Sequence, residues 1–289
     1  MSNLGTFVIH NGKLKRRTEI QFSLDHRCVR FADGFFETIR AFAINVPLLS
    51  LHYERIQKAF DILLLNKNKF PDEETLRFDI ERLIKSNKHF GSSRVRLTIY
   101  RAGKGNYSSD SDDIDWYIET IPLENKEFGN LKKGIHISVF EMIEKPISPL
   151  YSIKINHAIF YILAAEWAKK NELDDAVLIN SKQNLVEATS SNIFVLIDKI
   201  IYTPPLSDGC VDGVMRKYVL NYILPQLGVE VKETSITKQV LLDADEIFLT
   251  NAITGCQTVL AYQSRRYYNN LSNQIINKLN EKLIYEQHH

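Results

Sequence analysis

The fold is decided by the stretch that opens with Tyr151-Ser-Ile-Lys154-Ile-Asn-His157 and closes with Asn184-Leu-Val-Glu187-Ala-Thr-Ser-Ser-Asn192. Between these two segments the pattern predicts a helix over 156–170 and a buried strand over 176–180. A loop, helix and strand of this length can bring the amine of Lys154 and the carboxylate of Glu187 to opposite ends of one small ring. The stretch therefore predicts a site for a ring-shaped cofactor.

The two residues suit one kind of covalent chemistry. Ile153 and Ile155 flank Lys154, and burial at this point would favour the neutral, nucleophilic amine. Glu187 is either a strand-end carboxylate satisfied by the N–H groups of the following turn, or the partner of a protonated ring nitrogen. A nucleophilic lysine with such a carboxylate is what pyridoxal phosphate chemistry requires.

A phosphate site should then exist elsewhere, and three places could supply it. Gly213 precedes a predicted helix over 214–227, whose first free N–H groups, at Val214 and Met215, would face an anion. The small-residue turn 250–255 follows a predicted strand. Arg55 offers a planar guanidinium suited to phosphate, although an arginine taken alone is more often a helix-surface residue.

The pattern of the whole chain predicts two domains. A small N-terminal α/β domain is expected over residues 1–121, a polar linker over 122–129, and a larger C-terminal cofactor-binding domain over 130–289. Helices are expected at 51–65, 72–86, 156–170, 214–227 and 273–284. Strands are expected at 7–10, 20–22, 35–43, 95–101, 116–121, 135–140, 176–180, 193–196, 200–202, 229–233 and 246–249.

Composition narrows the functional class. The 289 residues are 44% hydrophobic and 25% charged, with a formal net charge of +1, so no bulk field favours nucleic acid or an anionic membrane. No apolar run is long enough to span a bilayer, and the N-terminus lacks a secretion signal, so we expect a cytoplasmic protein. Neither the three cysteines nor the histidines show metal-ligand spacing, and we expect no metal site.

Several motifs, in their order along the chain, resemble those of one family. They are Asp33-Gly-Phe-Phe-Glu-Thr-Ile-Arg40, His52-x-x-Arg55, Lys154, Glu187-Ala-Thr-Ser-Ser-Asn192, Thr203-Pro-Pro, Gly213-Val-Met-Arg216 and Thr250-Asn-Ala. The series closely resembles the class IV aminotransferases, the fold-type IV pyridoxal phosphate enzymes, over nearly the whole chain. That resemblance implies a two-domain α+β or α/β fold like that of D-amino acid aminotransferase, with the cofactor in the cleft between the domains, and a homodimer.

The resemblance also assigns roles to residues. Lys154 would form the Schiff base and act as general acid and base, and Glu187 would pair with the pyridine nitrogen. The cofactor's phosphate and remaining groups would contact Arg55, the backbone of Val214, Met215, Asn251 and Ala252, and Ser190 and Ser191. Asn156 and His157 lie near enough in sequence to contact the phenolate oxygen.

Within the family, the motifs favour the aminodeoxychorismate lyases, which release pyruvate and form 4-aminobenzoate, a folate precursor. The loop Gly103-Lys-Gly-Asn-Tyr-Ser108, the segment Val211-Asp-Gly-Val-Met-Arg216 and Asn251-Ala-Ile resemble the lyases. The branched-chain enzymes differ around the lysine, where this chain has Lys154-Ile-Asn-His. The Arg-x-His pair of the D-amino acid enzymes has no counterpart at Arg101-Ala-Gly.

Every member of the family acts on an amino-acid-type substrate through an external aldimine, so the reaction depends on the substrate pocket. Thr38 could assist proton delivery to the leaving group. The candidates for binding the substrate, whose lyase form carries two carboxylates, are Arg40, Arg96, Arg101, Lys104 and Tyr107. The alternatives are an amino-acid transaminase acting on branched-chain or D-amino acids with 2-oxoglutarate, and a cofactor-free scaffold protein.

Overall fold

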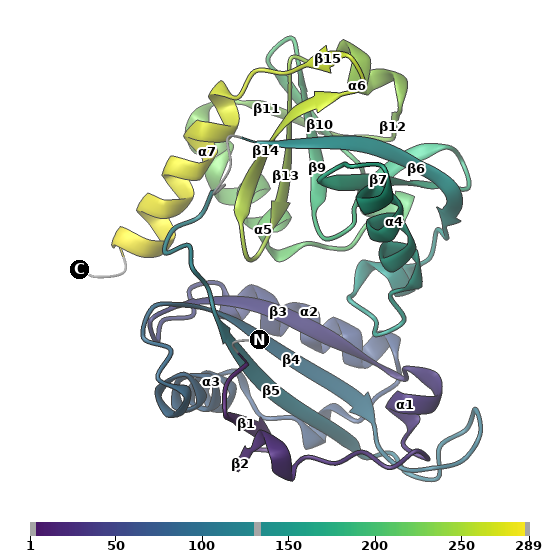
Figure 1. Cartoon of the computed structure of the whole chain (residues 1–289), viewed down its shortest axis with the longest axis vertical. Coiled ribbons are helices and arrows are strands. Elements are labelled where there is room, and N and C mark those ends of the chain that lie inside the picture. The colour runs from purple at the N-terminus through teal and green to yellow at the C-terminus, as the bar shows by residue number, and fades with distance from the viewer. Residues whose placement is uncertain (1–3, 130–133, 287–289) are drawn as a thin grey trace. The chain divides into compact units, whose positions relative to one another are not determined.

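The computed structural model describes residues 4–129 and 134–286 (Figure 1). The chain divides into two compact units, the first within Met1–Lys126 together with Ile153–His157, the second within Glu127–Ser152 together with Ala158–His289. The segment around Lys154 thus belongs to the first unit, although it follows the predicted linker in sequence. None of the helices in the described ranges is long and apolar enough to cross a membrane.

The first unit is built on a five-stranded sheet in the order β2-β1-β5-β4-β3, in which every neighbouring pair is antiparallel. Its strands are β1 (Phe7–His10), β2 (Lys13–Arg16), β3 (Gly34–Phe42), β4 (Ser92–Arg101) and β5 (Ile114–Pro122). The expected strand over 20–22 is wrong. Asn11 and Gly12, with φ of 48° and 75°, form a two-residue hairpin turn, so the second strand follows at once as β2.

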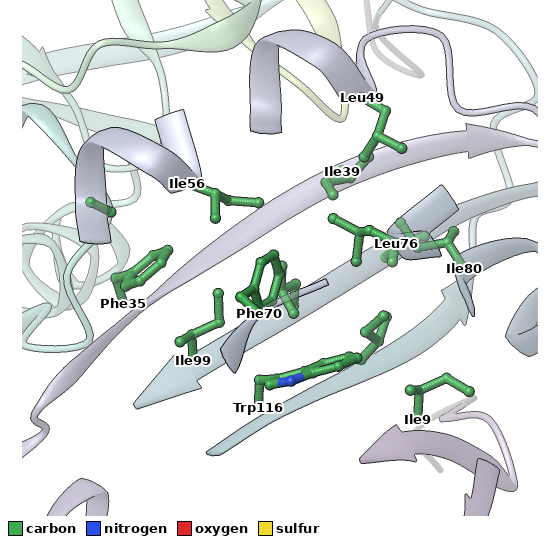
Figure 2. Close-up of a cluster of buried hydrophobic side chains, with 14 of the residues drawn as sticks. Ile9, Phe35, Ile39, Leu49, Ile56, Phe70, Leu76, Ile80, Ile99 and Trp116 are labelled. Atoms are coloured by element: carbon green, nitrogen blue, oxygen red, sulfur yellow. The ribbon is translucent and has the colours of Figure 1, made fainter. Parts of the chain in front are cut away.

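Two long helices cover one face of this sheet. They are α2 (Leu49–Ile62) and α3 (Glu73–Asn87), and a short helix α1 (Arg27–Phe31) precedes β3. The Asp72 side chain accepts a hydrogen bond from the Thr75 N–H at 2.9 Å, which caps α3 where the sequence predicts its start. Figure 2 shows the resulting core, in which Ile56 and Leu76 of the helices lie against Phe35 and Ile39 of β3.

Strand alternation fixes what the other face carries. On β3 the odd-numbered residues enter the core, so Phe36, Thr38 and Arg40 point to the opposite face. β3 is the edge strand of the sheet, and its free edge is partly paired by the segment around Lys154. The Phe36 N–H donates to the Lys154 carbonyl at 2.9 Å, and the Asn156 N–H donates to the Gly34 carbonyl at 3.0 Å. An edge that would otherwise leave backbone groups unpaired is thereby satisfied.

The second unit contains a ten-stranded mixed sheet in the order β11-β10-β9-β13-β14-β6-β7-β8-β12, with β15 attached to β14. Its strands are β6 (Ile135–Lys145), β7 (Asp175–Asn180), β8 (Asn184–Ala188), β9 (Asn192–Ile197), β10 (Ile200–Thr203), β11 (Glu230–Glu233), β12 (Ile236–Thr237), β13 (Glu246–Asn251), β14 (Gly255–Tyr262) and β15 (Arg265–Arg266). The predicted hairpin over 193–202 is confirmed as the antiparallel pair β9 and β10. The sequence reading missed β8, β12, β14 and β15.

Four helices belong to this unit: α4 (Ile159–Lys170), α5 (Val214–Tyr218), α6 (Gln239–Asp243) and α7 (Asn270–Asn280). The helix predicted over 214–227 begins as expected but is not regular. It passes into a π-helical turn at Val219–Ile223 and then a 3₁₀ turn at Pro225–Leu227, because Pro225 cannot donate to the preceding turn. In Figure 1 α4 lies beside β6 and β7, the two parallel strands that it connects.

Candidate active site

Lys154 is held by its backbone and by its apolar neighbours. Ile153 is buried in the core of the first unit and Ile155 packs against it, as the flanking residues suggested. The side chain of Lys154, which is half-buried, has its Nζ 5.2 Å from the centre of the Phe36 ring. The Arg96 guanidinium lies over the same ring at 3.9 Å. An amine and a guanidinium therefore share one aromatic ring.

The register of the sheet brings further predicted residues to this face. β3 and β4 pair so that Thr38 faces Arg96 and Arg40 faces Arg94. Burial lowers the pKa of Arg96. Arg96 forms no ion pair among the residues that the structure describes. Its cross-strand neighbour Glu119 is instead bound by Arg17 at 2.8 Å. The face thus carries three guanidinium groups in adjacent positions.

Arg40 also makes contacts that stabilise the fold. Its Nη2 donates to the Asn125 carbonyl at 2.6 Å and to Ser92 Oγ at 3.3 Å, and its guanidinium lies 4.7 Å from the Phe42 ring centre. Burial lowers the pKa of Arg40 to about 10. The contact with Asn125 fixes the stretch that follows β5 against the sheet, so part of this guanidinium is committed to the fold.

Arg55 lies on the opposite, helix-covered face of the sheet. Its Nε and Nη2 form a bidentate pair with the two oxygens of Glu37, each at 2.7 Å, and His52 Nδ1 lies 2.7 Å from Glu37 Oε2. All three side chains are buried. Burial alone would raise the pKa of Glu37, but Arg55 and His52 outweigh it and lower it to about 2.

The other predicted substrate residues belong to or border the loop after β4. Arg101 donates to Asp33 Oδ2 at 3.1 Å and to the carbonyls of Leu63 and Leu64 at 2.7 and 3.1 Å. Lys104 is exposed, and Tyr107 is 93% exposed. Arg101 is therefore tied to the first unit's own backbone, whereas Lys104 and Tyr107 face solvent.

A residue missed from the sequence holds this loop in place. Arg27 is 3% exposed and its guanidinium donates to the carbonyls of Asn106 and Tyr107 at 2.7 and 3.2 Å. It also pairs with Asp33 at 2.8 Å. One buried cation thus satisfies two loop carbonyls, so the loop is attached at its middle.

Glu187 lies at the end of β8 in the second unit and is 3% exposed. Its Oε1 accepts hydrogen bonds from Lys145 Nζ and from the Tyr161 hydroxyl, the latter at 2.8 Å. Its Oε2 accepts one from the Val211 N–H at 2.9 Å and a long one from Asn192 Nδ2 at 3.5 Å. Neither Lys145 nor Tyr161 was identified from the sequence.

Burial near Glu187 keeps the Tyr161 hydroxyl and the Cys210 thiol uncharged. Burial, followed by the charge of Glu187, raises the pKa of the Tyr161 hydroxyl well above its usual range. Burial likewise raises the pKa of the Cys210 thiol to about 12, so this thiol is not a nucleophile near neutral pH. The chemistry here is that of an oriented carboxylate rather than of a thiol or a phenolate.

The start of α5 adjoins this carboxylate through Asn192. The Asn192 amide donates to the Val211 carbonyl at 2.9 Å, and a Cβ on Gly213 would lie 1.9 Å from Asn192 Oδ1. Glycine is therefore required at 213 because a side chain approaches it there. The first N–H groups of α5, at Val214 and Met215, have no acceptor within the helix, as at any helix start.

The turn after β13 contains or contacts the remaining residues that the sequence predicts at the cofactor. Asn251 Nδ2 donates to Ser191 Oγ at 2.9 Å, while its Oδ1 accepts from the N–H groups of Ile253 and Thr254. Ser191 is buried, Ser190 is exposed, and Ala252 lies within this turn. The hydroxyls of Thr250 and Thr254 are buried without a hydrogen-bond partner among the described residues. A buried hydroxyl without a partner keeps a donor that an anion such as phosphate would satisfy.

Comparison with known proteins identifies the family of this chain. Residues 34–262 match the family model described as amino-transferase class IV. The chain is 28% identical to an aminodeoxychorismate lyase from Vibrio harveyi, covering 82% of this chain and 85% of that protein. It is 27% identical to a D-alanine aminotransferase from Bacillus licheniformis, covering 84% of each.

Among solved structures, the branched-chain aminotransferase of Thermoproteus uzoniensis with norvaline superposes with a TM-score of 0.87 at 24% identity. The superposition covers 98% of this chain and 96% of that one, so the fold is shared along almost the whole length. The family match extends over most of the chain, from the start of β3 to the end of β14. The chain belongs to the class IV aminotransferases, enzymes that use pyridoxal phosphate.

Proposed function

We propose that this enzyme is an aminodeoxychorismate lyase that binds pyridoxal phosphate through Lys154. The observation that carries the proposal is the ring of Phe36, with Lys154 Nζ at 5.2 Å and the Arg96 guanidinium at 3.9 Å. A substrate carboxylate held by Arg96 would keep the rest of the molecule within reach of this amine. Bound cofactor supplies an electron sink for the carbanion that forms when the substrate loses a proton.

In this proposal the chain's own residues bind, orient and move protons. Lys154 takes the proton from the substrate carbon that carries the amine, and Glu187 keeps the ring nitrogen of the cofactor protonated. Thr38 delivers a proton to the leaving group, a role supported by its position opposite Arg96 in the β3–β4 register. The cofactor's phosphate and its neighbouring atoms would be held by Arg55, by the N–H groups of Val214, Met215 and the 251–252 turn, and by Ser190 and Ser191.

The lyase is favoured over a simple transaminase by the charge on the sheet face. Its substrate carries two carboxylates, and Arg96 shares its face of the sheet with two further arginines: Arg94, two positions earlier on β4, and Arg40, which faces Arg94 on β3. Arg94 Nε is buried without a partner among the described residues, so it can donate a hydrogen bond to the second carboxylate. Arg101 is a weaker candidate because Asp33 and two carbonyls already engage it.

Transamination is the second candidate, favoured by the similar identity to a D-alanine aminotransferase. Two incubations separate the reactions. Pyruvate and 4-aminobenzoate released from aminodeoxychorismate support the lyase. Glutamate formed from an amino acid and 2-oxoglutarate, without pyruvate release from aminodeoxychorismate, would replace it with the transaminase. On the family resemblance, we also propose that the enzyme is a cytoplasmic homodimer. Analytical ultracentrifugation would test the dimer.

The covalent step has its own test, which compares the two lysines on which the site depends. The protein is loaded with pyridoxal phosphate, reduced with borohydride, digested and mapped by mass spectrometry. We expect the label on the peptide that contains Lys154, and its loss in Lys154→Ala. A label on the Lys145 peptide would overturn the assignment, and a protein that stays colourless and unlabelled would favour a cofactor-free scaffold.

A further inference from the structure

Lys145 is the most deeply buried charged side chain near the candidate site. It ends β6 and is 0% exposed. Its ammonium donates to Glu187 Oε1 and, at 2.6 Å, to the carbonyl of Gly209. The rings of Tyr151 and Tyr161 lie with their centres 5.3 and 5.2 Å from Nζ. Two oxygen acceptors and two aromatic rings surround this amine on the described residues, so its hydrogen-bond donors are already engaged by the fold.

The two oxygens of Glu187 are used unequally. A carboxylate oxygen accepts about two hydrogen bonds. Oε1 already accepts two, from Lys145 and Tyr161. Oε2 accepts one well-formed bond, from the Val211 N–H, and its second contact, with Asn192, is at the 3.5 Å limit. One more donor can therefore approach Oε2 but not Oε1.

We propose that Lys145 is a positioning residue, the fixed counter-ion of Glu187, which holds Oε1 and leaves Oε2 for the ring nitrogen of the cofactor. The inference rests on the proposed function, because it takes Glu187 as the partner of that nitrogen. It adds that the buried carboxylate is neutralised by the chain itself before cofactor binds. Glu187 is then shared between two cations in the loaded enzyme, so Lys145 weakens its attraction for the protonated ring.

Removing Lys145 should affect the empty and the loaded protein differently. Without the ammonium, the buried Glu187 keeps only neutral donors, and leaving one member of a buried ion pair unpaired is strongly destabilising. In the loaded protein the ring nitrogen supplies the missing positive charge. By linkage, a variant that is destabilised more when empty than when loaded must bind the cofactor more tightly.

The experiment measures cofactor affinity and unfolding in matched variants. The dissociation constant of pyridoxal phosphate is titrated for the wild type, Lys145→Met, Lys145→Gln and Lys145→Arg, and urea unfolding is followed with and without cofactor. We expect about tenfold or more tighter binding in Lys145→Met and Lys145→Gln, since coupled neighbours typically interact at this scale. Lys145→Arg, which keeps the charge, should bind the cofactor less tightly than the two neutral variants and closer to the wild type.

Each outcome decides between the roles. Equal affinities in all four proteins, with the same loss of stability in empty and loaded forms, would mean that Lys145 is only structural. Weaker binding in the two neutral variants would also overturn the counter-ion role. If Lys145→Met folds only with cofactor present, the inference is supported, and Lys145→Gln, which keeps a donor for Glu187, supplies the affinity. A wild type that does not bind pyridoxal phosphate would remove the proposed function and this inference together.

Discussion

Replacing Glu37 by glutamine should destabilise the first unit by roughly 3 kcal/mol at pH 7 and by almost nothing near pH 2. Arg55 and His52 lower the pKa of the buried Glu37 carboxyl from 4.5 to about 2. A difference of this size corresponds to roughly 3 kcal/mol, at about 1.4 kcal/mol for each factor of ten in proton affinity. Breaking a buried ion pair from one side costs about 3–5 kcal/mol, so two independent arguments agree.

The sign of the pH dependence follows from the direction of that pKa change. Because the pKa is lowered in the folded chain, the stabilisation by Glu37 is complete above its ordinary pKa of 4.5. It disappears as the pH falls from there towards 2, where the folded carboxyl takes up its proton. Glu37→Gln has no carboxyl to protonate, so the wild type should lose its advantage over the variant in this window.

The assay uses the position of the two tryptophans. Trp116 lies in the core of the first unit and Trp167 lies on α4 in the second. In a Trp167→Phe background, the fluorescence of Trp116 therefore reports urea unfolding of the first unit alone. Glu73→Gln is the matched control, because Glu73 forms a partly exposed pair with Arg77 at 3.2 Å, which is worth about 0.5 kcal/mol or less.

Two results would refute this reasoning. The first is a Glu37→Gln effect at pH 7 no larger than that of Glu73→Gln. The second is a difference between the wild type and Glu37→Gln that stays constant from pH 7 down to pH 3. Either would show that the carboxylate does not depend on its buried cation for its charge.

Two further predictions follow from close contacts. Gly213→Ala should cost about 1–3 kcal/mol and weaken cofactor binding, because the new Cβ would lie 1.9 Å from Asn192 Oδ1 and displace that side chain. Gly91→Ala, where a Cβ meets nothing within 4 Å, should change urea stability by less than about 0.5 kcal/mol, and equal costs would contradict the argument. Arg27→Met should accelerate amide hydrogen exchange in the loop 103–113 severalfold while leaving α3 unchanged, and unaltered loop exchange would exclude the anchoring role.

The elements that the sequence predicted well are those with local signals. The helix that begins after Asp72 was predicted because an acidic cap and apolar spacing occur within one segment. The strand predicted over 7–10 is confirmed, whereas the strand predicted over 20–22 is wrong, because the next strand is Lys13–Arg16. The Asn11-Gly12 dipeptide is the stronger signal, because positive φ at both positions suits a tight hairpin. That error was avoidable from the sequence.

The site was only partly predictable, for a physical reason. Ile153 and Ile155 indicated that the chain around Lys154 is buried, and they do enter the core of the first unit. Nothing near Lys145 in the sequence indicates burial, because it follows Glu144 and precedes Pro146. What buries it is Glu187, forty-two positions further along the chain, and the Gly209 carbonyl. A lone lysine is normally solvated, so only the tertiary fold could identify this one.

The two lysines also show why residue type alone does not assign a chemical role. Either could be matched with Glu187 from composition, and the structure gives Lys145 the direct contact. Contact with a carboxylate stabilises an ammonium, whereas a nucleophile must reach its neutral form. The Lys154 amine instead shares an aromatic ring with the Arg96 guanidinium. The direct contact with Glu187 therefore makes Lys145 the better counter-ion, and the borohydride label tests whether Lys154 is the nucleophile, as we propose.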